Sequence, residues 1–200
     1  MVSAAIGLRA HSGWAALVAI VGPPRAPDVI LRRRIEFLDR SIPGAAQPYH
    51  AAAEMKLRDG EELIERCRAA AGALAAKALE DVFALVRKKG CEPVACGILA
   101  ASGRPLPELP AILASHALIH TAEGEMFREA LAQASGALGL AAIRVPEKIL
   151  YQEAEARLGV AEPEWKTHLA ELGRRIGPPW RQDEKNATII AALALAAVAR

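Results

Sequence analysis

The sequence predicts an α/β fold with a five-stranded mixed sheet, in the element order β-β-β-α-β-α-β-α. Strand-length apolar or alternating segments occupy residues 3–10, 14–22 and 28–38, and only short turns separate them. Two later segments, 93–100 and 140–145, each follow a long stretch of helical periodicity. Strands joined by short turns form an antiparallel meander, whereas strands separated by helices are usually parallel and connected by right-handed crossovers.

The turns and the basic residues of the meander can be assigned in the same way. Ser12-Gly13 marks the first turn, and the segment "GPPRAP" (22–27) marks the second. The third strand contains three consecutive arginines, of which Arg32 and Arg34 share one face of the sheet. We expect that face to be solvated.

Two long helices are predicted after the meander. Pro48 is placed to begin the first, over 49–88, and Asp59-Gly60 is a candidate kink within it. The second helix covers 110–138 and is ended by a glycine. We predict one domain over 1–200, with a helical C-terminal part (147–200) that contains helices at 147–158, 163–175 and 183–199.

Composition excludes several classes of protein. The 200 residues carry a formal net charge of +2 with acids and bases interspersed, which indicates no clear nucleic-acid patch. Three cysteines without a Cys-x-x-Cys pair are typical of buried thiols in a reducing compartment. The apolar run 187–199 is shorter than the about 20 residues that span a bilayer, and no signal peptide is evident. We therefore expect a cytoplasmic protein with no membrane partner, and leave a homodimer open.

The element order and two short segments resemble the ribonuclease H superfold, in its Holliday-junction resolvase branch. The first hairpin of that branch reads roughly Gly-Ile-Asp-Pro-Gly and then Thr-Gly-Trp/Tyr-Ala, and this chain has "IGLRAHSGWA" at 6–15. The last core helix of the branch carries Asp-x-x-Asp-Ala, and "DEKNA" places Asp183 and Asn186 at those positions. The resemblance implies a three-layer fold and a carboxylate cluster that binds two metal ions.

The departures from that pattern concern the acids themselves. Arg9 stands where the resemblance expects the first-strand Asp, Asn186 replaces the last acid, and the strand "EPVACGIL" has no internal carboxylate. Two-metal cleavage needs carboxylates that hold two cations about 4 Å apart. We therefore predict no nuclease activity of the two-metal kind. Arg9, His11 and Asp183 remain candidates for binding a ligand.

A polar row on the second long helix is the other candidate site. At about 100° per residue, His116, His120 and Glu123 project into the apolar arc of the segment "HALIHTAEGEMFREAL", which predicts that they are buried and linked. The row can supply three ligands to zinc or another divalent metal, or orient an imidazole for acid–base work. It can equally be a structural network, because buried polar groups are normally paired.

His50 and Glu54 on the first long helix can converge with this row, since the two helices pack side by side in the superfold. His50, Glu54, His116, His120 and Glu123 are therefore the candidate catalytic residues. Two function classes follow. The first is an enzyme or binding protein for a small or phosphorylated molecule or a metal, and the second is a non-catalytic interaction domain with a structural His/Glu network. The sequence indicates no substrate.

Overall fold

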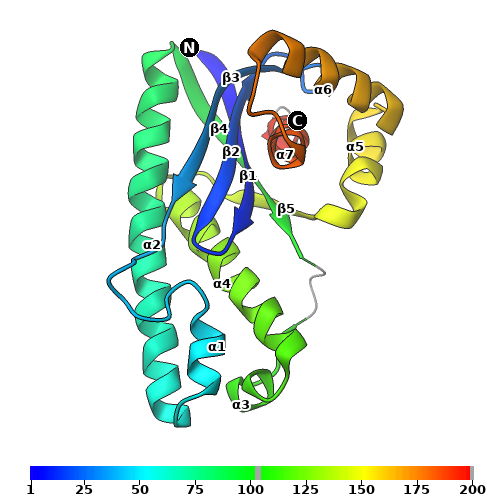
Figure 1. Ribbon diagram of the computed structural model, residues 1–200. Coiled ribbons are helices and arrows are strands. Elements are labelled where there is room, and N and C mark those ends of the chain that lie inside the picture. The colour runs from blue at the N-terminus through cyan, green and yellow to red at the C-terminus, as the bar shows by residue number, and fades with distance from the viewer. Residues whose placement is uncertain (102–104, 199–200) are drawn as a thin grey trace.

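The computed structural model describes residues 1–101 and 105–198, and it contains the predicted five-stranded mixed sheet (Figure 1). The strand order is β3-β2-β1-β4-β5. β1 pairs antiparallel with β2 and β2 with β3, whereas β1–β4 and β4–β5 are parallel. This confirms the meander followed by parallel strands. The strands are β1 (Val2–His11), β2 (Trp14–Val21), β3 (Asp28–Glu36), β4 (Cys91–Ala100) and β5 (Ala142–Pro146).

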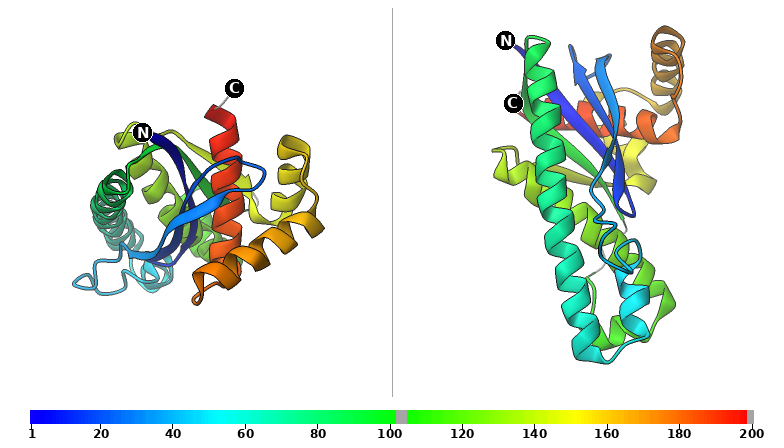
Figure 2. Two further views of the ribbon diagram at one scale, coloured as in Figure 1. Left: turned by 90° about the horizontal axis from the view of Figure 1, so that it is seen from above. Right: turned by 60° about the vertical axis from the view of Figure 1, so that its left-hand side comes forward.

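Helices cover both faces of the sheet. α2 and α4 lie on one face and α7 on the other, with α5 and α6 outside α7 (Figures 1 and 2). The helices are α1 (Pro48–Ala53), α2 (Leu57–Lys88), α3 (Leu109–Leu113), α4 (His116–Ala137), the 3-10 turn η1 (Glu147–Ile149), α5 (Leu150–Leu158), α6 (Glu162–Ile176) and α7 (Gln182–Val198).

The sheet separates two hydrophobic cores because successive side chains of a strand point to opposite faces. Ile6 and Leu8 of β1 belong to the core under α2 and α4. Val18 and Ile20 of β2 belong to the other core, which packs against Ile190 of α7. The central strands are therefore apolar on both faces, as the continuous apolar run of β4 predicts.

Both long helices are interrupted where the sequence predicts continuous ones. The first breaks between Ala53 and Leu57, and not at Asp59-Gly60, which lies inside the continuous helix α2. Gly60 instead lets α1 pack closely on α2, because a Cβ at that position would lie 3.0 Å from Ala52. The second breaks between α3 and α4 at Ala114 and Ser115. As a result, α1, α3 and the adjoining ends of α2 and α4 extend beyond the sheet (Figure 1).

The three cysteines are free and buried, as predicted. Burial raises the pKa of the Cys96 thiol to about 11, so this thiol stays protonated at neutral pH. Among the helices of the described residues, none has the length and hydropathy needed to cross a membrane.

Candidate functional site

A cluster of charged side chains lies where β1 ends, on the face of the sheet that α7 covers. Gly7 permits a very close approach of that helix, since a Cβ there would lie only 1.8 Å from the Ala187 carbonyl oxygen. Side chains two and four residues further along β1 share that face, so Arg9 and His11 also point toward α7. The packing at Gly7 therefore sets the distance between β1 and the start of α7.

Arg9 bridges two carboxylates in this cluster, which we call the Arg9 network (Arg9, His11, Glu147, Asp183 and Asn186). Its Nε donates to Glu147 Oε1 at 2.9 Å, and its Nη1 lies 2.8 Å from Asp183 Oδ1. Asn186 Nδ2 donates to the same Glu147 oxygen at 2.8 Å. One guanidinium thus offsets the charge of two neighbouring carboxylates, in a site where its own side chain is 25% exposed.

The His11 ring joins this network to the outer strands of the meander. His11 Nε2 lies 2.8 Å from Asp183 Oδ2. The same nitrogen also lies 2.7 Å from Arg9 Nη1, which can only donate, so it faces a donor on one side and an acceptor on the other. The ring stacks on Trp14 at 3.9 Å between centroids, and the Arg34 guanidinium lies 3.7 Å from the centre of the Trp14 ring on β2. An unbroken row of cation, aromatic ring and imidazole therefore leads from β3 to Asp183.

The expectation of a solvated face for Arg32 and Arg34 is wrong for Arg32. Its guanidinium donates to four consecutive main-chain carbonyls at the end of α6 and just after it, those of Ile176, Gly177, Pro178 and Pro179, at 2.5–3.0 Å. These bonds fix the segment that leads into α7. Arg32 thereby helps to place the side of the site that carries Asp183.

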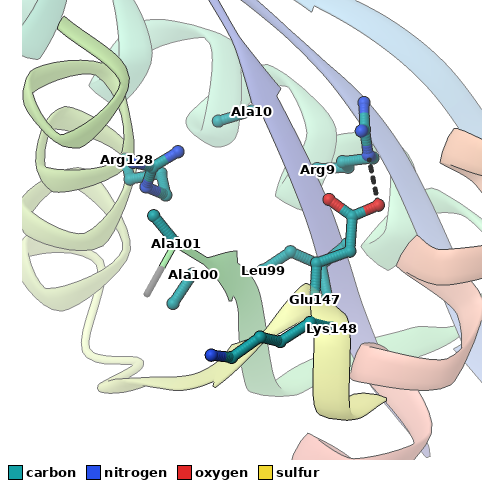
Figure 3. Close-up of a pocket in the computed structure, with 8 residues that line it drawn as sticks. All are labelled: Arg9, Ala10, Leu99, Ala100, Ala101, Arg128, Glu147 and Lys148. Carbon is teal, nitrogen blue, oxygen red and sulfur yellow. Dashed lines mark hydrogen bonds and ion pairs between the residues drawn. The ribbon is translucent and has the colours of Figure 1, made fainter. Parts of the chain in front are cut away.

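A cavity of about 290 Å³ adjoins the Arg9 network at the carboxyl ends of β1 and β4 (Figure 3). Open α/β sheets bind ligands at such ends of their strands. Arg128 faces the chain at Ala100 and Ala101 from α4, and Lys148 approaches them from the opposite side, next to Glu147 (Figure 3). The cavity is lined by Arg9, Ala10, Leu99, Ala100, Ala101, Arg128, Glu147 and Lys148.

The cavity contains residues that sequence reasoning missed. Glu147 and Lys148 follow a short edge strand, and Arg128 is one of several charged residues on α4, so no motif distinguishes them. Arg128 is held by Glu125, whose Oε2 accepts from its Nε at 2.9 Å. It also lies over Gly124, where a Cβ would come within 3.0 Å of the guanidinium. Only the tertiary structure brings these residues together with Arg9.

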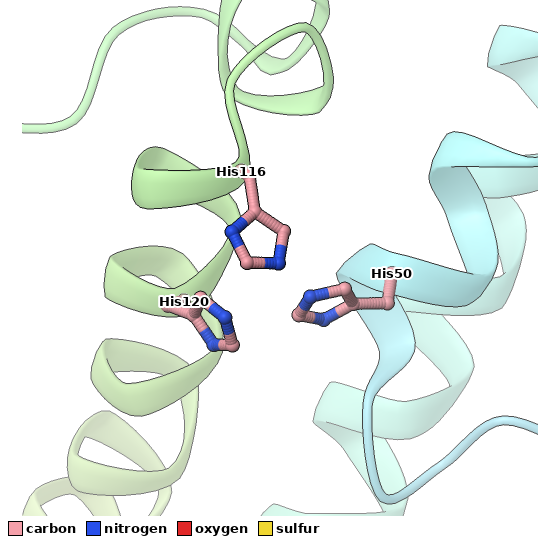
Figure 4. A group of neighbouring side chains, drawn as sticks. All are labelled: His50, His116 and His120. Atoms are coloured by element: carbon pink, nitrogen blue, oxygen red, sulfur yellow. The ribbon is translucent and has the colours of Figure 1, made fainter.

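The second polar cluster lies between α1 and α4, beyond the sheet, and contains His50, His116 and His120 (Figure 4). Each ring offers one nitrogen such that the three lie within 4.8 Å of one another. The ring centroids are 4.5 Å apart for His116–His120, 4.7 Å for His50–His120 and 5.3 Å for His50–His116. We call this group the histidine cluster.

Glu123 supports the histidine cluster from inside the protein. This carboxylate is only 3% exposed. Its Oε1 accepts from the His50 main-chain N–H at 3.1 Å and lies 2.9 Å from His50 Nδ1. Because a carboxylate only accepts, we assign a proton to His50 Nδ1, which leaves a lone pair on Nε2 in the neutral ring.

The structure corrects the predicted burial of this row. Glu123 is buried as predicted, but His116 and His120 are exposed, and Glu123 bonds to His50 instead of to them. The error comes from treating 110–138 as one helix that covers the sheet throughout. The first turns of α4 extend past the sheet, where α1 and α3 shield them only partly (Figure 1).

Glu54 does not take part in the histidine cluster. It follows the last turn of α1, where its main-chain N–H bonds to carbonyls of that helix, and it is exposed. Within the described part of the chain, no hydrogen bond joins its side chain to the three histidines. His50 is therefore the residue by which α1 contributes to the histidine cluster.

Comparison with known proteins identifies the fold. The chain is similar to Thermus thermophilus RuvC in complex with a Holliday-junction substrate, with a TM-score of 0.52 and 10% sequence identity over 98% of this chain and 95% of that one. A second Thermus thermophilus RuvC structure gives a TM-score of 0.50 and 11% identity over the same shares. No family model matches the chain, and no curated protein matches its sequence.

These likenesses confirm the ribonuclease H-like, resolvase-like fold that the element order and the two short segments predict. At such low identity they show the fold alone. Arg9 on β1 and Asp183 on α7 meet across the sheet–helix contact, as the resemblance implies for the residues at those positions. The difference from the family's pattern is that the contact here joins a cation, Arg9, to an anion, Asp183.

Proposed function

We propose that this chain is a resolvase-like domain that binds the phosphodiester backbone of a nucleic acid without cleaving it by the two-metal mechanism. The observation that carries the proposal is the Arg9 guanidinium, which lies between Asp183 and Glu147 at 2.8 and 2.9 Å. It supplies a permanent positive charge where the resemblance implies an acid and a metal ion.

The donor set of the Arg9 network does not fit two magnesium ions. Magnesium requires near-octahedral oxygen ligands at about 2.0–2.1 Å. Asp183 uses one oxygen toward Arg9 and the other toward His11, and one oxygen of Glu147 accepts from both Arg9 and Asn186. Two divalent cations would add four positive charges beside the guanidinium, against only two carboxylates.

β4 provides no replacement for the missing acids. Its one carboxylate, Glu92, lies at the opposite end of the strand and pairs with Arg87 at 2.8 Å. Neither Asn186 nor Arg9 can act as an anionic ligand. We therefore assign no cleavage step to this site.

The cavity beside the Arg9 network supports binding of a phosphate group. Arg128 and Lys148 approach it from two sides, and Arg9 stands at its edge. Cationic side chains of this kind position phosphates through charge-assisted hydrogen bonds. The similar Thermus thermophilus protein is seen with a Holliday-junction substrate, which makes a nucleic acid the first ligand to test. Since the net charge is only +2, affinity depends on these local cations.

Fluorescence anisotropy with a labelled four-way DNA junction, a duplex and a single strand tests the proposal. We expect binding that weakens with salt, and we expect Lys148→Ala to weaken it further and to reduce the slope of log affinity against log salt by about 1. Lys77→Ala removes the same charge from an exposed position on α2 and serves as the matched control. Equal effects of the two variants would contradict the assignment of the cavity.

A second candidate is a non-catalytic interaction domain whose polar network only fixes packing. The internal pairing of Arg9 with Glu147 and Asp183 favours it, because the network already satisfies its charges without a ligand. Under this alternative, no nucleic acid binds. If the labelled junction does bind, competition by inorganic phosphate or by a free nucleotide shows whether the cavity takes a small phosphorylated ligand instead of a polynucleotide.

A further inference from the structure

We propose that His50, His116 and His120 form a binding site for a divalent transition-metal ion, with zinc as the metal that suits the ligands best. This site is independent of the proposed function. It lies between α1 and α4 beyond the sheet, and eight residues, or about 12 Å of helix rise, separate His120 from Arg128. The inference rests on three observations: the convergence of the rings, the support of His50 by Glu123, and the shortage of other partners for the rings.

The convergence is close to what a metal site requires. Zinc–nitrogen distances of about 2.0–2.1 Å in tetrahedral geometry place the ligand nitrogens about 3.4 Å apart. The three nitrogens already lie within 4.8 Å of one another. Small rotations of the side chains close this difference. His116 and His120 are exposed and one helical turn apart, so their rings are free to make these rotations.

Glu123 supplies the support that metal-bound histidines usually have. Such a histidine donates its second ring N–H to a carboxylate or carbonyl, which fixes the tautomer and raises the basicity of the ligand nitrogen. His50 has this arrangement, since its Nδ1 lies 2.9 Å from Glu123 Oε1. Burying that carboxylate costs free energy unless it is paired. The buried Glu123 thereby holds His50 ready to bind through Nε2.

The remaining two rings have few other partners. In the described part of the chain, neither His116 nor His120 forms a side-chain hydrogen bond, and Glu123 is the one carboxylate bonded to any ring of the cluster. Three imidazoles this close cannot all be protonated without repulsion. Their neutral forms present lone pairs that a cation can share.

The chemistry of the ligands selects the metal. Neutral imidazoles bind zinc, copper, nickel and cobalt, whereas magnesium and calcium prefer oxygen. Three protein ligands leave one tetrahedral position, and the exposure of His116 and His120 keeps it open to water. A bound ion would also connect α1 to α4, two elements that meet beyond the edge of the sheet. The helical spacing predicts His116, His120 and Glu123 as the ligands. In the structure His50 takes the third position, and Glu123 orients His50 without coordinating the metal.

Titration calorimetry of chelator-treated protein without a polyhistidine tag, first with zinc and then with cobalt, tests the site. We expect one ion per chain and a visible d–d spectrum for cobalt. His116→Ala and His120→Ala each lower the zinc affinity more than about 100-fold, because loss of a second-shell partner alone costs about 10–100-fold. Glu123→Gln should lower the zinc affinity by about 10–100-fold. Magnesium binds nowhere in the cluster.

His168→Gln is the matched control, because this histidine lies on α6, where its ring bonds to the Pro27 carbonyl oxygen, and an amide can replace that bond. It should leave zinc affinity unchanged. Both exposed cluster histidines can be replaced with little cost in folding, which circular dichroism verifies. Absence of zinc binding to the intact chain, or equal losses for His168→Gln and His120→Ala, would overturn the proposal.

Discussion

The Arg9 network and the histidine cluster are built in opposite ways. In the Arg9 network, opposite charges alternate and each carboxylate has a cation within 3 Å. In the histidine cluster, three bases of one kind lie together and only His50 is bonded to a carboxylate. The Arg9 network thus contains its own cation, whereas the histidine cluster offers nitrogen ligands to a cation from outside.

Together, the two proposals place a metal at a different position of the fold from the one that the resemblance implies. The resemblance implies metal at the position of the Arg9 network, where we propose that the Arg9 guanidinium supplies the positive charge instead. The histidine cluster is built on α1 and on the part of α4 beyond the sheet, so it does not depend on the contact between β1 and α7. The predictions below separate the two clusters by perturbing one at a time.

The largest effect is expected from Gly7→Ala. The added methyl group would meet the Ala187 carbonyl oxygen at 1.8 Å, so α7 must move away from β1. Overpacking usually costs about 1–3 kcal/mol and sometimes more. Because the β1 backbone and the α7 backbone are both rigid, we expect Gly7→Ala to lower the free energy of unfolding by about 3 kcal/mol or more. Urea denaturation measures the loss, and the Arg9–Asp183 pair should be disrupted while zinc binding at the histidine cluster persists.

Gly72→Ala is the control for this change. Gly72 lies within α2, and a Cβ there would meet no atom within 4 Å. Alanine favours helix over glycine by up to about 1 kcal/mol, so this variant should be slightly more stable than the unmodified chain. If Gly7→Ala were equally harmless, the close contact of α7 with β1 would not set the geometry of the Arg9 network.

Glu123→Ala should lower the free energy of unfolding by about 1–3 kcal/mol, because it strands the His50 main-chain N–H and ring N–H without their acceptor. His116→Ala, on the exposed side of the same cluster, should change it by no more than about 0.5 kcal/mol. Equal stability losses for the two variants would mean that the histidine cluster is a packed structural network and not a set of exposed metal ligands.

Arg9→Met keeps most of the aliphatic stem and removes the cation between Glu147 and Asp183. Since Arg9 and Asp183 are about a quarter exposed, solvent screening limits the loss of unfolding free energy to about 1 kcal/mol. The loss should shrink in 1 M salt, where exposed charges are screened. A loss that does not respond to salt would point to packing as the role of the Arg9 side chain.

The fold was largely predictable because its signals are local. Alternating apolar residues, the turn at Ser12-Gly13 and the glycines after the helices mark most elements within a few residues of their observed ends. The two helix breaks were not predictable. Leu113 and His116 are separated only by Ala114 and Ser115, which are compatible with helix, so tertiary packing decides that α3 and α4 are separate.

The candidate sites were predictable only in part. Arg9, His11 and Asp183 were found because the resemblance assigns two of their positions, but Glu147 and Lys148 join them through contacts that no spacing reveals. Periodicity gives the face on which His116 and His120 lie. It cannot tell how far α4 extends beyond the sheet, and this decides their exposure.

The central claim is that Arg9 replaces metal-dependent cleavage by binding, and one measurement tests it most directly. A labelled four-way junction and an RNA–DNA hybrid are incubated with saturating protein in magnesium and then in manganese, and the strands are separated on a denaturing gel. The account predicts that anisotropy reports bound nucleic acid while the strands stay intact. Metal-dependent cleavage that disappears in Asp183→Asn would contradict it.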